Sequence, residues 1–140
     1  MTDDLWHAPL ARIRSAELHG DTRQTPGMTR LEAISGVSCG SEKLWMGQTH
    51  VAPGVNSGDH HHGAAETAIY VVSGHPVFVF AEGSQEVRLE ADPGDYIFVP
   101  PYAPHREENP GEEEAVVVIA RSSQEGIVVN LPSLWPPADQ

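Results

Sequence analysis

The sequence predicts a single all-β domain built as a small double-sheet barrel. Thirteen glycines and twelve prolines interrupt the 140 residues at short intervals, which favours short strands over helices. Val and Ile are frequent between these breaks, as in strands. Three runs, at 69–72, 77–80 and 116–119, are apolar on both faces, as expected of strands that a second sheet covers.

Eight strands follow from this punctuation. In order they are expected at 30–34, 44–52, 67–72, 76–81, 85–90, 95–99, 115–120 and 126–131. The residues from Glu82 to Gln85 are typical of a hairpin turn. The glutamate-rich stretch 107–114 is expected to be a solvated loop, because it lacks the Asp, Asn and Gly spacing of a calcium site.

The domain organisation is expected to have three parts. Residues 1–29 form an N-terminal arm, 30–131 the barrel and 132–140 a C-terminal tail. The tail contains apolar residues and prolines suited to lying across a surface, where it would cap the barrel or a dimer seam. No second domain is expected at this length.

Three histidines and one glutamate have spacings that suit a single metal ion. His60 and His62 share one face of an extended strand, because side chains alternate, and His61 points to the other side. The small residues that follow allow the chain to turn and bring Glu66 back beside this pair. His105 follows a proline-stiffened bend at the end of another strand and is the expected fourth ligand.

This donor set indicates a reactive centre rather than a sealed structural site. Imidazole nitrogens with one carboxylate suit one divalent Zn, Fe, Ni or Cu ion, and Mn and Co are also admissible. Four protein ligands in an octahedron leave two positions for water, substrate or dioxygen.

The two segments that carry these donors resemble the paired motifs of the cupin superfamily, G-x5-H-x-H-x3,4-E-x6-G and G-x5-P-x-G-x2-H-x3-N. Two departures occur: Gly74 comes one residue late, which lengthens a strand or inserts a bulge, and Tyr102 replaces a glycine of the second motif. The matching positions are Gly54, His60, His62, Glu66, Gly94, Pro100, His105 and Asn109.

The resemblance implies a double-stranded β-helix, or jelly-roll barrel, with a metal site of three histidines and Glu66. On this basis, replacement of Glu66 or His105 should lower metal occupancy at least about tenfold. The arm of related small barrels commonly pairs with a second subunit, so a homodimer with an exchanged arm is implied, against a disordered or self-packed leader.

Three functions remain open at this point. The first is a metal-dependent enzyme that oxidises a small metabolite with dioxygen. The second is non-oxidative isomerisation, rearrangement or lyase chemistry at Zn or Mn. The third is a metal-dependent binding or sensing protein without turnover, although the DNA-binding helix pair typical of regulators is not evident.

Charge and composition exclude several partners. The net charge of −12 repels nucleic acid and anionic lipid surfaces. No apolar stretch long enough to span a membrane and no secretion leader are apparent, so a cytoplasmic location is expected. The lone Cys39 excludes an internal disulfide and agrees with a reducing compartment.

The substrate pocket is predicted from aromatic and polar side chains on the expected strands. An acidic substrate would make Arg121, Lys43 or Arg30 the cations to test, whereas Arg106 is expected to pair with neighbouring glutamates. The candidate pocket residues are Trp45, Gln48, His50, Tyr70, Phe80, Phe98, Tyr102 and Arg121.

Overall fold

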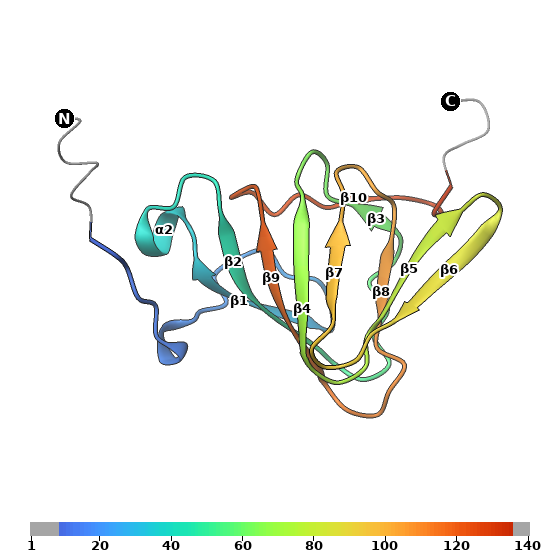
Figure 1. The fold of residues 1–140 in the computed structure, drawn as a ribbon, viewed down its shortest axis with the longest axis horizontal. Coiled ribbons are helices and arrows are strands. Elements are labelled where there is room, and N and C mark those ends of the chain that lie inside the picture. Colours follow the sequence, from blue (N-terminus) through green and yellow to red (C-terminus); the bar gives the residue numbers. More distant parts are fainter. Residues whose placement is uncertain (1–8, 136–140) are drawn as a thin grey trace.

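The computed structural model describes residues 9–135 and confirms a nearly all-β architecture. The first eight residues of the expected arm and the last five of the tail lie outside the described residues. A five-stranded antiparallel sheet forms one layer, in the order β1-β2-β9-β4-β7 (Figure 1). Its strands are β1 (Met28–Ile34), β2 (Trp45–Val51), β9 (Ala115–Arg121), β4 (Thr67–Ser73) and β7 (Tyr96–Val99).

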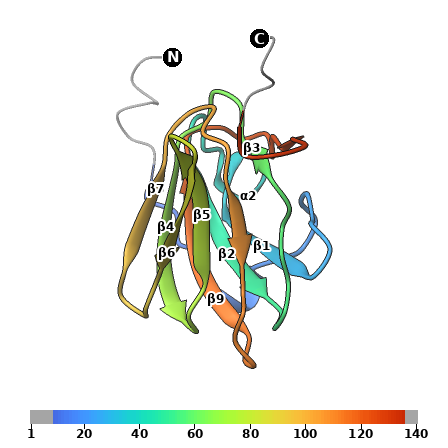
Figure 2. The same cartoon turned by 90° about the vertical axis from the view of Figure 1, so that its right-hand side faces the viewer.

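The second layer consists of shorter strands. β6 (Gln85–Glu90), β5 (Val77–Glu82) and β8 (Arg106–Glu108) form one sheet, and β10 (Val129–Asn130) pairs with β3 (His60–His61). An antiparallel bridge between His60 and His105 joins β3 to the segment that leads into β8. The view of Figure 2 places β5 and β6 in front of strands of the large sheet.

Alternation along the strands separates a buried core face from a solvent face. On β4 the residues Thr67, Ile69 and Val71 are buried, whereas Ala68 is exposed and Tyr70 half-buried. The main core cluster lies between the two layers, and its buried members are Ile69, Val71, Phe78, Ala91, Val99, Val117 and Ile119. Burial of these apolar side chains is the main favourable contribution to folding.

The expected strands agree with the structure except at short elements. β1 begins two residues earlier than expected, and the last strand is reduced to Val129–Asn130. A short helix α2 (Gly36–Cys39) and the strand β8 were not predicted, because such short elements carry too little periodicity to recognise. The extended strand expected around His60 and His62 is only two residues long, β3. The prediction of a solvated acidic loop was wrong at its start, since Glu107 lies within β8 and is buried, while Glu112 to Glu114 are exposed.

The described part of the arm packs on its own chain. A short 3-10 helix η1 (Ser15–Glu17) precedes an antiparallel bridge between His19 and Glu32 of β1. At the other end, Leu134 is buried against Val77 and Val79 of β5. Leu134 therefore covers part of the outer face of the short sheet. Within the described residues, no helix is long and apolar enough to cross a membrane.

The late glycine of the first motif is accommodated by a bulge. The pairing of β4 with β9 shifts register between Val71 and Ser73, and Gly74 follows with φ of +81°. A Cβ at Gly74 would lie 2.7 Å from the Cα of Ala115. The position therefore requires glycine both for its backbone conformation and for the close approach of the next strand.

Gly74→Ala is expected to lower the free energy of unfolding by about 2–4 kcal/mol, because a left-handed conformation and an overpacked contact both disfavour a side chain. Gly83→Ala is the matched control, since Gly83 has φ of +62° and a Cβ added there would have no atom within 4 Å. Urea unfolding of both variants measures the difference. Equal losses would show that the contact with Ala115 has no cost.

Candidate metal centre

His60 and His105 are held opposite each other by the backbone. The His60 N–H donates to the His105 carbonyl and the His105 N–H donates to the His60 carbonyl, both at 2.9 Å. A reciprocal pair of this kind fixes two residues directly across an antiparallel ladder. Two histidines that are distant in the sequence are thereby placed side by side.

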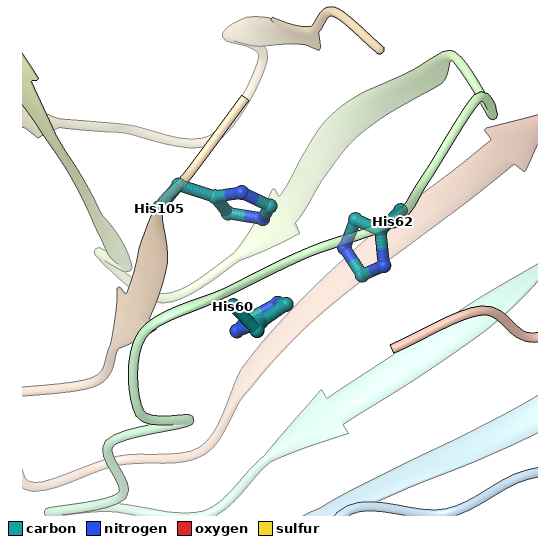
Figure 3. A group of neighbouring side chains, drawn as sticks. All are labelled: His60, His62 and His105. Carbon is teal, nitrogen blue, oxygen red and sulfur yellow. The ribbon is translucent and has the colours of Figure 1, made fainter. Parts of the chain in front are cut away.

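His62 joins them from the residue after β3. The ring centroids are 4.5 Å apart for His60 and His105, 4.8 Å for His60 and His62, and 5.0 Å for His62 and His105. One ring nitrogen from each residue lies within 4.8 Å of the others. Two nitrogens bound to one ion, each at about 2.1 Å, can be at most about 4.2 Å apart, and the observed separation of up to 4.8 Å is slightly larger than this limit. Figure 3 shows the three rings converging on one space.

Each imidazole is oriented by a backbone carbonyl. Nδ1 of His60 lies 2.8 Å from the Gly58 oxygen, and Nδ1 of His62 lies 2.8 Å from the Ile127 oxygen. Nδ1 of His105 lies 2.9 Å from the Ala103 oxygen. A carbonyl only accepts hydrogen bonds, so Nδ1 carries the proton in all three rings. The lone pair of each Nε2 is therefore free to bind a cation, in the arrangement that metal-binding histidines commonly adopt.

Burial keeps these imidazoles neutral. Removal from water, with a smaller contribution from the neighbouring imidazoles, lowers the pKa of His62 to about 3 and that of His105 to about 4. The pKa of His60 is also lowered, chiefly by burial. Three neutral nitrogen donors with fixed tautomers and a shared centre fit a divalent transition metal ion, which His60, His62 and His105 would hold.

Glu66 does not join this group in the structure. It precedes β4, its side chain is exposed, and its backbone N–H donates to the Ser122 hydroxyl. The next residue, Thr67, is buried and lines the cavity beside the histidines. Successive side chains on a strand point to opposite faces, so only one of these two positions can face inward. The contribution of Glu66 to the site is therefore not confirmed.

The three histidines line a cavity of about 230 Å³ between the sheets. Its wall also contains two half-buried arginines, Arg30 of β1 and Arg121 of β9, and one buried carboxyl group, Glu107 of β8. The exposed Arg23 and Glu125 lie at its rim. Burial raises the pKa of Glu107 to about 7, although Arg30 opposes the shift. The volume is below the usual range of about 300–1,000 Å³ for drug-sized ligands, which limits the cavity to a small molecule.

Of the predicted pocket residues, only Arg121 lines this cavity. Trp45 is buried behind it, with the Arg121 guanidinium 3.9 Å from the ring centroid. Gln48 and His50 hydrogen-bond to each other away from the cavity, and Tyr70 packs on Tyr96. Phe80 and Phe98 line a separate apolar hollow, and Tyr102 is exposed near His61.

The reason for these differences is strand parity. Trp45 and Arg121 are paired across β2 and β9 with their side chains on the core face, whereas the alternate residues Gln48, His50 and Tyr70 point outward. The same rule of alternation would have identified Glu107, which the sequence analysis assigned to a solvated loop. His105, Glu107 and Asn109 are alternate and all buried, so a strand that starts at His105 places Glu107 inside.

Two layers of antiparallel strands around three converging imidazoles define a small β-barrel protein with a candidate mononuclear metal centre. The family model described as a cupin domain matches residues 47–121, more than half of the chain, and the chain belongs to that family. The resemblance drawn from the two motifs is thereby confirmed. No protein with a curated description matches the chain in sequence.

Solved structures with the same fold include several enzymes. The polyketide cyclase RemF from Streptomyces resistomycificus is 19% identical, with a TM-score of 0.71, over 94% of this chain and 89% of that one. A double-stranded β-helix protein from Klebsiella pneumoniae is 18% identical, with a TM-score of 0.65, over 89% of this chain and 100% of that one.

An oxalate oxidase is 22% identical, with a TM-score of 0.66, and the match covers 81% of this chain. The matched part amounts to 59% of the oxalate oxidase chain, so this chain spans about three fifths of that length. At these identities the likeness shows the fold alone.

Proposed function

We propose that this cupin is a metal-dependent enzyme that acts on a small metabolite at one divalent ion held by His60, His62 and His105. The observation that carries the proposal is the set of hydrogen bonds from the three Nδ1 atoms to backbone carbonyls. They leave three Nε2 atoms unprotonated and free to bind a metal ion. A structural role alone would not require three tautomers of the same kind around one space.

The bound ion would supply Lewis acidity or electron transfer to a substrate in the cavity. The protein contributes the rest of the site. Ile69, Val99 and Ile119 form an apolar wall that limits access of water, and the two arginines present positive charge on the same cavity. Thr67 lines the cavity, whereas the adjacent Glu66, the glutamate of the motif, is exposed. The strand β4 therefore adds no negative charge to the cavity.

Oxidation with dioxygen is the first candidate reaction. Three protein donors in an octahedron leave three positions, enough for a substrate with two donor atoms together with dioxygen. Non-oxidative rearrangement, isomerisation or lyase chemistry is the second candidate. The observation that favours it is the donor set itself, because three histidines without a carboxylate also form catalytic zinc sites. Related folds include proteins described as an oxalate oxidase and as a polyketide cyclase.

Metal content and oxygen consumption separate these reactions. Protein purified from its own host is analysed for metals, stripped, and reloaded with Fe²⁺ or Zn²⁺ before a screen with small acids, phenols and diketones. Oxygen uptake that requires iron supports the oxidase or dioxygenase function, and oxygen-independent turnover with zinc supports rearrangement. Ligand binding without turnover under either metal would leave a sensor and overturn the proposal of an enzyme.

The homodimer and the cytoplasmic location stay predictions. Light scattering coupled to size-exclusion chromatography measures the first, with about twice the 15.1 kDa chain mass expected.

A further inference from the structure

Two arginines face the cavity of a strongly acidic protein. The chain has eight Lys and Arg against twenty Asp and Glu, so most of its cations could be neutralised at the surface. Arg30 and Arg121 instead lie on core-facing positions of β1 and β9 and line the same cavity as the three histidines.

Among residues 9–135, neither of these arginines forms an ion pair with a carboxylate. Nη1 of Arg30 donates to the Thr25 hydroxyl at 2.9 Å and to the Arg23 carbonyl at 3.4 Å. Arg121 donates from Nε and Nη2 to the carbonyls of Ser123 and Gln124. Within the described residues, these bonds leave Nε and Nη2 of Arg30 and Nη1 of Arg121 without a protein acceptor.

Two arginines of the outer surface form ion pairs, whereas the exposed Arg12, Arg14 and Arg23 form none within the described residues. Arg106 contacts Asp59, Glu86 and Glu108 at 2.7–3.3 Å, as the sequence predicted for a surface pair, and Arg88 contacts Glu108 at 3.0 Å. A partly buried guanidinium without a counter-ion is costly unless a bound group compensates the charge. Because Arg30 and Arg121 are partly buried and line the cavity, their unpaired charge is suited to an anion that enters it.

A hydrogen-bond acceptor completes the site. Glu107 is 7% exposed, and its Oε1 has no hydrogen-bond partner within the described part of the chain. Its carboxyl group lines the same cavity but lies beyond ion-pair distance of Arg30. An unsatisfied buried oxygen costs roughly 1–3 kcal/mol, so a ligand that donates a hydrogen bond to it is favoured. The cavity thus presents cationic donors and a separate acceptor.

We infer that the substrate is a small carboxylic acid with a hydroxyl group near the carboxylate, the carboxylate bound by Arg30 and Arg121 and the hydroxyl donated to Glu107. Guanidinium groups match the geometry of carboxylates, and charge-assisted bonds are about twice as strong as neutral ones. The cavity of about 230 Å³ restricts the acid to a small one. The inference rests on the proposed function, because it names the substrate class of the same site.

Three probes that differ in one group each test the inference. Lactate has both groups, propionate lacks the hydroxyl, and lactamide lacks the charge. Calorimetric titrations of zinc-loaded and metal-free protein should show lactate bound about tenfold more tightly than propionate, and no measurable binding of lactamide. Equal affinity for lactate and lactamide would overturn the inference.

Single-residue variants show which side chains bind lactate. Arg30→Gln should weaken lactate binding at least about tenfold, and Arg30→Lys should restore part of it. Glu107→Gln should reduce the preference for lactate over propionate. Arg88→Gln is the matched control, since Arg88 lies outside the cavity, and it should bind lactate as the parent does. Unchanged lactate affinity in Arg30→Gln would overturn the inference.

If the Arg30 variants do not fold, a measurement on the parent protein tests the same inference. Lactate should shift the side-chain Nε–H signals of Arg30 and Arg121 in ¹⁵N spectra and leave that of Arg88 in place. A shift confined to surface arginines would contradict the inference.

The metal measurements keep the two proposals separate. Loss of metal in His105→Ala with retained, Arg30-dependent lactate binding would support acid recognition whatever the ion does. Metal binding by the parent protein with lactate affinity independent of Arg30 would leave the proposed function standing and overturn the inference. Lactate binding that depends on Arg30 in a protein that binds no metal would overturn the proposed function alone.

Discussion

His105→Ala is expected to lower the affinity for Zn²⁺ at least about 100-fold, because it removes one of three ligands. Loss of an outer hydrogen bond to a metal-binding histidine already costs about 10–100-fold, and loss of the ligand itself costs more. The affinity is measured by competition with a chromophoric chelator. His50→Ala is the matched control, because His50 binds Glu114 and Gln48 away from the cavity.

Glu66→Ala decides between the motif and the geometry. The motif predicts that this variant loses metal at least about tenfold. The exposed position of Glu66 predicts instead that the affinity stays within about twofold of the parent, since an exposed surface charge contributes little. A tenfold loss in Glu66→Ala would show that this side chain turns inward when a cation is present, and would restore the ligand set of the motif.

His62 and His105 are expected to destabilise the metal-free protein as the pH falls from 6.5 to 4. Glu107 offsets part of this loss, because its raised pKa makes the folded protein bind a proton over the same range. The folded-state pKa values of His62, about 3, and His105, about 4, lie below the ordinary value of about 6.5. Between these values the unfolded chain binds protons that the folded protein does not, so acid favours unfolding. The stability contributed by neutral imidazoles is complete above pH 6.5 and declines as the pH falls toward the folded-state pKa values.

Urea unfolding at a series of pH values measures this effect. At about 1.4 kcal/mol for each unit of pKa, it amounts to a large part of the roughly 5–15 kcal/mol of a typical domain. His62→Asn should have a shallower pH dependence, because it removes one of the groups and leaves the carboxylates unchanged. Bound Zn²⁺ should preserve stability to lower pH. A pH dependence in His62→Asn as steep as that of the parent would contradict the burial of a neutral His62.

Much of the fold follows from local patterns. The apolar runs at 69–72, 77–80 and 116–119 lie in β4, β5 and β9. Of the two outcomes expected for the late Gly74, a longer strand or a bulge, the structure has a register shift between Val71 and Ser73. These features depend on side-chain alternation and on backbone conformations that only a few residue types adopt. The strand β8 and the pairing of β3 could not be predicted, because they depend on contacts with distant segments, such as the His60–His105 bridge.

The candidate site divides in the same way. His60, His62 and His105 could be recognised from spacing, because the motif positions and strand parity agree for all three. Glu66 could not be placed reliably, since the turn of Gly63, Ala64 and Ala65 sets which of Glu66 and Thr67 begins the inward series of β4. A shift of one residue exchanges the two faces of a strand.

By itself the sequence determined the barrel class and the three imidazoles. Both can be recognised from residue types and from intervals within short segments, two of which carry the histidines. Only the tertiary structure decided which charged groups share the cavity. Arg30, Glu107 and Arg121 come from three strands of two sheets, and their meeting depends on the register and pairing of those sheets. Register is set by the packing of the whole core, which no single segment encodes.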